Sequence, residues 1–153
     1  MSFEFLPADL ELSISVIDQD HDRLYSYVDL FDKAVERNDL AALGFIFLEL
    51  IEYTKFHFAR EEAGFAACGY EAAPGHMEEH GALKLTAAQL QIELDEQPES
   101  FTPEKLREIH DFLVSWLNDH IAVSDMSYKS TFADAPDAVK TMEAFTMEQF
   151  REQ

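Results

Sequence analysis

The sequence contains few residues that break helices or cross-link chains. Its 153 residues include five glycines, five prolines and one cysteine. A single cysteine, Cys68, cannot form an internal disulfide, which excludes a small disulfide-stapled scaffold and favours a reducing, cytoplasmic environment. We interpret Cys68 as a small buried hydrophobic residue rather than as a reactive thiol.

Basic residues and long hydrophobic runs are also scarce. Eleven Lys and Arg residues stand against 31 Asp and Glu residues, which gives a net charge of −20. This charge repels nucleic acids and anionic lipid headgroups. The first seventeen residues include Glu4, Asp9 and Glu11 without a basic start, and no hydrophobic run approaches membrane-spanning length. We therefore expect a cytoplasmic protein that neither binds nucleic acid nor inserts into a membrane.

Long segments with a helical repeat make up most of the chain. Hydrophobic residues recur at alternating steps of four and three, as in Leu43, Phe47, Leu50 and Thr54. Thr102-Pro103 has the form of a helix start, with a capping residue before a proline. Four such segments with short connections predict an all-α, up-down-up-down four-helix bundle. Residues that break helices separate the segments at positions 38–39, 69–75, 97–103 and 134–136.

Polar residues continue these hydrophobic stripes, where an unpaired charge would cost several kcal/mol. In an up-down-up-down bundle, the starts of the first and third helices lie beside the ends of the second and fourth. All seven polar side chains are therefore predicted to converge in one layer. They are His21 on the first helix, His57 and Glu61 on the second, His76 and His80 on the third, and His120 and Asp125 on the fourth.

Five imidazoles and two carboxylates are too many ligands for one first-row metal ion, but they suit two ions bridged by carboxylates. The set differs from that of carboxylate-rich di-iron bundles, because no Glu-x-x-His occurs in the chain. His120 and Asp125 are five residues apart, which corresponds to about 140° around a regular helix. Both can face the same site only if the turn between them is widened, as in a π-bulge.

The ordered set of motifs resembles the hemerythrins, particularly the bacterial ones, over residues 10–132. The motifs are Ile17-Asp18-x-x-His21, His57-Phe58-x-x-Glu61, His76-x-x-x-His80 and Trp116-Leu117-x-x-His120-Ile121-x-x-x-Asp125. The resemblance implies two non-haem iron ions with a bridging oxo or hydroxo group. It assigns His76, His80 and His120 to one iron, His21 and His57 to the other, and Glu61 and Asp125 as bridges.

The same resemblance implies reversible dioxygen binding for carriage, storage or delivery, with no enzymatic activity and no catalytic residue. It also implies an apolar oxygen pocket formed by Phe58, Trp116, Leu117 and Ile121. Ser13 departs from the family, because a glycine is common at that position, eight residues before the first ligand.

We predict a di-iron domain at residues 1–133 with an N-terminal arm at 1–17. An acidic, helical C-terminal extension at 134–153 follows. Asp134 is expected to cap its helix, which either packs on the bundle or contacts another protein.

Two alternatives remain. The first retains the iron centre but uses it for oxygen or redox sensing, or for handling iron, nitric oxide or peroxide. The second is a zinc hydrolase, because His76-Met77-Glu78-Glu79-His80 matches the H-x-x-E-H pattern of two zinc ligands and a general base. That reading leaves five of the seven polar stripe residues without a role. Metal content distinguishes the two chemistries, since one predicts two irons and the other predicts one zinc.

Overall fold

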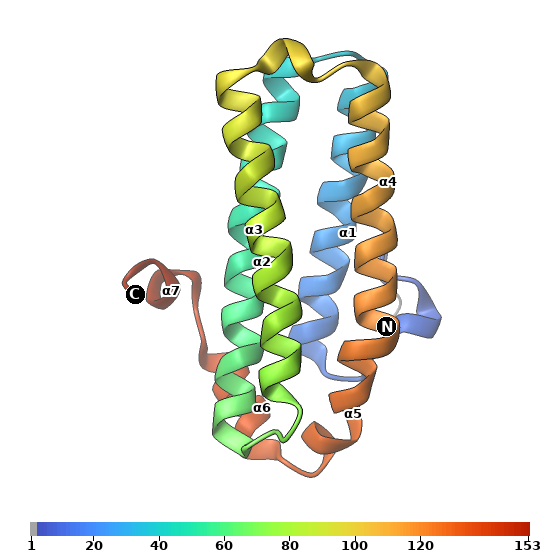
Figure 1. The fold of residues 1–153 in the computed structure, drawn as a ribbon. Helices are drawn as coiled ribbons and strands as arrows, with labels where there is room; N and C mark the ends of the chain where they lie inside the picture. Colours follow the sequence, from blue (N-terminus) through green and yellow to red (C-terminus); the bar gives the residue numbers. More distant parts are fainter. Residues whose placement is uncertain (1–2) are drawn as a thin grey trace.

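The computed structural model describes residues 3–153 and contains four long helices that pack side by side (Figure 1). A π-helical segment η3 and the short helix α5 continue the line of the fourth helix. This arrangement confirms the predicted all-α four-helix bundle. The long helices are α1 (Ser15–Glu36), α2 (Leu40–Cys68), α3 (Ala73–Glu96) and α4 (Pro103–Asp119), followed by η3 (His120–Asp125) and α5 (Met126–Ala133).

Local capping residues set the ends of the long helices. The side chain of Asp39 accepts a hydrogen bond from the backbone N–H of Ala42 and caps α2. Thr102 does the same for α4, with Pro103 as the first helical residue, so the helix start predicted there is confirmed. At the end of α2, Gly69 has a φ of 64°, a left-handed conformation that glycine adopts without strain.

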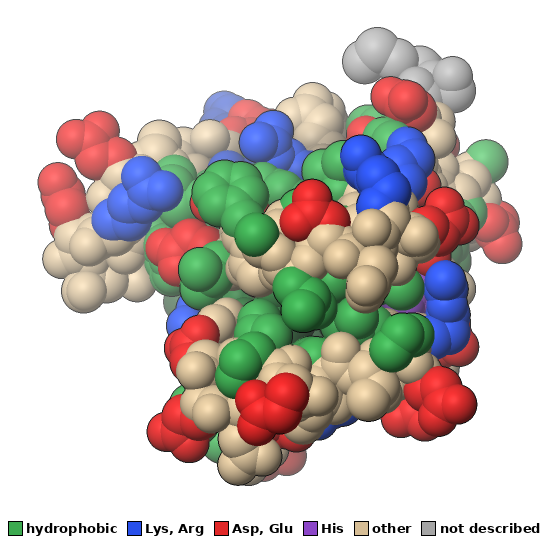
Figure 2. Space-filling model, turned by 90° about the horizontal axis from the view of Figure 1, so that it is seen from above, with side chains coloured by type: hydrophobic (Ala, Val, Ile, Leu, Met, Phe, Trp, Pro, Cys, Tyr) green, Lys and Arg blue, Asp and Glu red, His purple; other side chains and the backbone are tan. Residues whose placement is uncertain are grey.

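The core divides into two hydrophobic clusters, one toward each end of the bundle. One cluster includes Phe31, Phe47 and Leu106, near the α1–α2 and α3–α4 connections. Figure 2 looks onto that end of the molecule, where hydrophobic side chains gather near the middle and acidic side chains lie around the rim. The other cluster includes Phe65 and Tyr128, near the opposite end. Among the described helices, none is long and apolar enough to cross a membrane.

The N-terminal arm is anchored to α1 by two aspartates. Asp22 accepts hydrogen bonds from the backbone N–H groups of two residues in the arm, Phe5 and Leu6. Asp18 accepts from the N–H groups of Leu12 and Ser13, immediately before α1 begins at Ser15. The last three residues of the predicted arm, 15–17, therefore belong to α1, and the arm's first two residues lie outside the described part of the chain.

Ser13 occupies a conformation that favours glycine. Its φ is 63°, in the left-handed region that is sterically costly for residues with a side chain. This is the position at which the resemblance noted above implies a glycine. The structure supplies the physical reason, since the chain turns sharply here before entering α1.

The C-terminal extension forms two short helices, α6 (Pro136–Ala144) and α7 (Met147–Arg151). The predicted single helix capped by Asp134 is wrong in detail, because α6 follows Ala135 and Asp134 ends α5 instead. Phe145 is extended and separates the two helices. Thr146 then caps α7 through a reciprocal pair of hydrogen bonds with Gln149. Figure 1 shows α6 at the base of the bundle and α7 at its side.

The helix α6 packs closely on α2. Met142 is fully buried and Ala138 is 3% exposed. Met142 lies against α2 at Gly64, where a Cβ atom would come within 2.6 Å of the Met142 sulfur. Glycine at this position therefore lets the two helices approach, and α6 is part of the folded core rather than a free tail.

Candidate metal centre

The structure brings all seven polar stripe residues together in one buried layer. Each of them is at most 5% exposed. Their potential metal-binding atoms fall into two groups, each with its donor atoms within 4.8 Å of one another. The first group is Glu61, His76, His80 and His120, and the second is His21, His57, Glu61 and Asp125.

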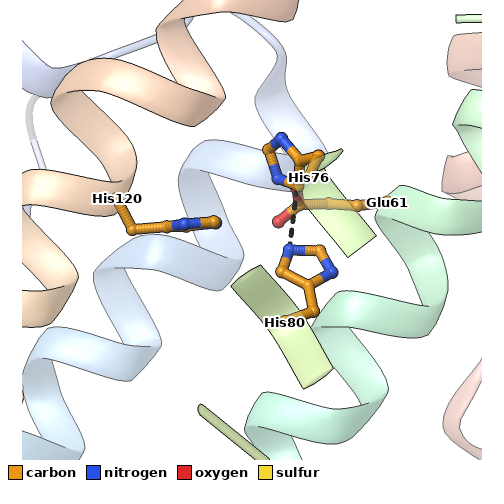
Figure 3. Close-up of side chains that lie close together, drawn as sticks. All are labelled: Glu61, His76, His80 and His120. Carbon is orange, nitrogen blue, oxygen red and sulfur yellow. Dashed lines mark ion pairs between the residues drawn. The ribbon is translucent and has the colours of Figure 1, made fainter. Parts of the chain in front are cut away.

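The first group contains three imidazoles around one carboxylate. Figure 3 shows His76, His80 and His120 approaching the carboxylate of Glu61 from different directions. The Nε2 atoms of His76 and His80 lie 3.2 and 3.9 Å from Glu61 Oε2. Three imidazole nitrogens and a carboxylate oxygen are donors that suit iron or zinc.

The two carboxylates lie between the groups. Glu61 belongs to both groups, and its Oε1 atom pairs with His57 Nε2. Asp125 Oδ1 lies 3.0 Å from His76 Nε2 and 3.1 Å from His120 Nε2, in the first group. Its other oxygen, Oδ2, lies 3.0 Å from His21 Nε2 in the second group. Each carboxylate can therefore offer one oxygen to each of two ions.

Asp125 reaches this position because of the wide turn predicted from its spacing. Residues His120–Asp125 form a π-helical segment between α4 and α5. A regular α-helix would have rotated Asp125 away from His120, whereas the wider turn returns it to the same face. The prediction of a widened turn is confirmed.

The donor atoms lack the hydrogen bonds that buried polar atoms normally make. In the described part of the chain, the Nε2 atoms of His21, His76, His80 and His120 have no hydrogen-bond partner, nor do the carboxylate oxygens of Glu61 and Asp125. Such unpaired atoms are costly, and so many around one point require an explanation. Metal ions among them would satisfy every one, so the residues present fit a dinuclear metal site.

Carboxylates hold the outer nitrogens of two of these histidines. His57 Nδ1 donates to Asp20 Oδ2 at 2.8 Å, and His80 Nδ1 donates to Glu62 Oε2 at 2.9 Å. A carboxylate on the far nitrogen of a metal-binding histidine fixes its tautomer and increases its basicity. Sequence analysis missed both carboxylates, although each is adjacent in sequence to a predicted ligand.

Charge pairing governs the protonation of the site in the metal-free protein. Burial lowers the pKa of His57, but Glu61 and Asp20 outweigh burial and raise it to about 10. Burial likewise lowers the pKa of His76, and Asp125 and Glu61 raise it to about 9. Metal ions must therefore displace protons from these rings, so metal binding releases protons and is favoured by higher pH.

Aromatic rings clamp two of the imidazoles. Phe58 stacks on His80 with ring centroids 3.7 Å apart, and Trp116 stacks on His120 at 4.4 Å. Both contacts restrict rotation of the imidazoles. They also cover the site with apolar surface.

An apolar cavity of about 40 Å³ adjoins the second group. His21, His57 and Asp125 of the second group line it, as does His120 of the first group. Three of the four predicted pocket residues, Phe58, Trp116 and Leu117, line the cavity as well. The fourth, Ile121, is fully buried in the core but is not among the cavity's described lining residues. The sequence analysis did not assign to the pocket six further lining residues, Leu24, Val28, Leu50, Thr54, Leu83 and Leu113, although they lie on the same helical stripes.

Two further sequence features lie outside this arrangement. Glu79 of the H-x-x-E-H pattern is half exposed, and it accepts a hydrogen bond from Ser124 on the outer side of His120. It is not placed as a general base beside an ion held by His76 and His80. His110, the sixth histidine of the chain, is remote from the two groups and pairs with Asp111 on α4.

Comparisons with known proteins agree with this geometry. Residues 12–131 match the family model described as the hemerythrin HHE cation binding domain. A bacteriohemerythrin of Clostridium acetobutylicum is 31% identical, with coverage of 78% of this chain and 94% of the relative. A bacteriohemerythrin of Stenotrophomonas maltophilia is 30% identical, covering 78% of this chain and 75% of the relative.

Similarity extends to a eukaryotic relative and to a solved structure. A hemerythrin-like protein of Naegleria gruberi is 26% identical over 74% of this chain and 80% of its own length. A crystal structure of a leucine-to-phenylalanine mutant superposes with a TM-score of 0.70 at 22% identity, covering 85% of this chain and 97% of that one. This last similarity concerns the fold. With its two buried histidine–carboxylate groups and a family match over most of its length, the chain belongs to the hemerythrin family.

Proposed function

We propose that this protein binds dioxygen reversibly at a carboxylate-bridged di-iron centre held by the seven buried residues, and that it is a binding protein rather than an enzyme. The bacteriohemerythrin relatives support this assignment. The observation that carries it is an asymmetry between the two donor groups. One group has three histidines, of which only His120 lines the apolar cavity. The other has two histidines, and both of them line the cavity together with Asp125.

The asymmetry favours ligand binding beside the second group. His21, His57 and the two carboxylates would give an ion fewer protein donors than the three histidines of the first group would give its neighbour, which would leave a position for a small ligand. The adjoining cavity, at about 40 Å³, exceeds the space that a single water molecule requires. A diatomic molecule fits such a space.

The residues around the cavity keep it dry. Leu24, Val28, Leu50 and Leu117 contribute hydrocarbon surface, and the Thr54 hydroxyl donates to the carbonyl of Leu50 at 2.6 Å, so it is already satisfied. Apart from the metal-binding side chains, the walls therefore offer water no free hydrogen-bond partner. When bound, the two ferrous ions supply the electrons that hold dioxygen. The dry walls disfavour its departure as a charged species, because an anion needs water to leave.

The proposal is tested by loading the protein with iron under anaerobic conditions and counting the metal. We expect two irons per chain. Exposure to oxygen should produce a visible absorption band that disappears when oxygen is removed under argon and returns when oxygen is readmitted. The same protein loaded with zinc serves as the colourless control.

Different results would contradict different parts of the proposal. One metal per chain would refute the dinuclear site and would favour the zinc alternative. Two irons with a band that does not reverse under argon would refute reversible binding and would favour redox sensing, or peroxide or nitric oxide handling, at the same centre.

A further inference from the structure

We infer that the C-terminal extension positions His57, through a chain of contacts from Phe145 to Arg60 and from Arg60 to Asp20. The inference rests on the proposed function only in taking His57 as a metal ligand. The contacts begin outside residues 12–131, the span that matches the family model. The extension would therefore adjust the metal centre from outside the span that matches the family model.

The Arg60 guanidinium joins the extension to the site. Its Nη2 donates to the backbone carbonyl of Phe145 at 3.1 Å, and its Nη1 donates to Asp20 Oδ1 at 2.8 Å. The planar guanidinium fixes the directions of both bonds at once. Because Arg60 is one residue before Glu61 on α2, its backbone is held by the same helical turn that carries two predicted ligands.

Asp20 transmits the contact to the metal centre. It is 1% exposed, and its two oxygens divide their partners. Oδ1 accepts from Arg60 and from the Tyr53 hydroxyl at 2.7 Å, while Oδ2 accepts from His57 Nδ1. Two donors on one oxygen fix the rotation of the carboxylate, and that rotation aims the other oxygen at His57. Without Arg60, the Tyr53 hydroxyl would be the one remaining described donor to Oδ1 that fixes the rotation of the Asp20 carboxylate.

Aromatic contacts hold the extension in place over Arg60. The Phe56 ring stacks on Phe145 with centroids 5.8 Å apart, and Phe150 meets it edge-on at 6.1 Å. The Arg60 guanidinium lies 4.5 Å from the centre of the same Phe56 ring. Phe56 is therefore the surface on which the extension and Arg60 both rest.

Solvent would reach the network if these contacts were lost. An open cleft of about 490 Å³ lies beside it, and Asp20, Tyr53 and Arg60 are among the lining residues. Water entering from this cleft would compete for Asp20. Loss of a carboxylate contact behind a metal-binding histidine typically weakens metal binding by roughly 10–100-fold.

Full-length variants test the inference. Arg60→Ala removes the link, and Phe145→Ala with Phe150→Ala weakens the docking of the extension without shortening the chain. Lys140→Ala removes a charge from an exposed position on α6 and serves as the matched control. The exchange rate of the His57 Nδ1–H proton is measured by NMR in metal-free protein. The two zinc affinities are then measured by competition with a chelator.

In Arg60→Ala and in the Phe145→Ala/Phe150→Ala variant, we expect the His57 Nδ1–H proton to exchange at least tenfold faster than in the unmodified protein. We also expect about a 10–100-fold loss of affinity for one of the two zinc ions. His80, which Glu62 holds, should keep its exchange rate and is the internal control. Lys140→Ala should change neither. In the Arg60→Ala background, the two phenylalanine substitutions should add nothing further, since the contact acts through Arg60.

Unchanged His57 exchange and zinc affinity in Arg60→Ala would overturn the inference. So would additive effects of Arg60→Ala and the phenylalanine substitutions, because these would show that the extension acts by another route. If the double phenylalanine variant does not fold, Phe150→Ala alone, which removes one of the two aromatic contacts on Phe56, takes its place. Neither readout uses iron or oxygen, so failure of reversible oxygen binding would refute the proposed function without touching this result.

Discussion

Replacing Leu117 by asparagine should greatly shorten the lifetime of the oxygen-dependent visible band while leaving iron bound. Leu117 is 7% exposed, lines the apolar cavity and lies one helical turn before His120. It is not a metal ligand. Asparagine is similar in size, so the change adds an amide to a dry wall without opening much space.

The size of the effect follows from the new hydrogen bonds. An amide gives water, or a departing anion, a partner that leucine does not offer, and a hydrogen bond to a charged group contributes about 1.5–3 kcal/mol. Applied to the barrier for loss of reduced oxygen, that range corresponds to roughly 10- to 150-fold faster decay. Leu117→Ala should act more weakly on decay, through enlargement of the cavity, and should lower the free energy of unfolding by about 2–5 kcal/mol.

The assay mixes the reduced protein with oxygen and follows decay of the band, with iron content measured on the same samples. Leu106→Ala is the control, because Leu106 is a buried leucine, 3% exposed, in the cluster at the other end of the bundle. It should lose comparable stability without faster decay. Unchanged decay in Leu117→Asn, or equal acceleration in Leu106→Ala, would refute the idea that Leu117 guards the site.

Three further predictions concern stability. In metal-free protein the pKa of His57 is raised from 6.5 to about 10, so its stabilising contribution is complete below pH 6.5 and is lost as the pH rises toward 10. Urea unfolding of chelator-treated protein should show this alkaline loss, and a flat profile from pH 6 to 10 would contradict it. Ser13→Gly should raise the free energy of unfolding by up to about 1 kcal/mol in urea titrations, because Ser13 has a φ of 63°. Gly64→Ala should lower it by about 1–3 kcal/mol, because the new Cβ would meet Met142 at 2.6 Å. Adding Met142→Ala should make the cost of Gly64→Ala smaller, as a double-mutant cycle would reveal.

The sequence predicted the features that depend on helical periodicity. The stripes place His21, His57 and His76 on inward faces, and bundle topology then brings them to one end. The same geometry predicted the wide turn before Asp125, since a spacing of five cannot face the site in a regular helix. These conclusions need only the pitch of a helix and the direction of the chain.

The contacts behind the metal centre could not be predicted in this way. Asp20 and Glu62 lie off the hydrophobic stripes and have the composition of solvated surface residues. Their burial depends on how far neighbouring helices rotate and on what covers them. In the case of Asp20 the partners include Arg60, 40 residues away, which the extension contacts in turn. The break at Phe145 was missed for a related reason, because it is set by packing on Phe56 rather than by a proline or glycine.

The π-helical segment affects both the direction and the axial position of the side chains that follow α4. At 100° per residue, Asp125 would point about 80° away from Leu117 if the turn were regular, and Tyr128 and Phe132 would be displaced by the same extra residue. The wide turn cancels that offset, so Asp125, Tyr128 and Phe132 point into the bundle as though the chain were one residue shorter. If Val123, which is 67% exposed, were deleted, a regular helix would point these side chains in the same directions. What it would lose is about one residue's rise, 1.5 Å, along the bundle axis. The additional residue therefore sets how far along the bundle axis the Asp125 carboxylate lies between the two donor groups. It leaves the direction of that side chain unchanged.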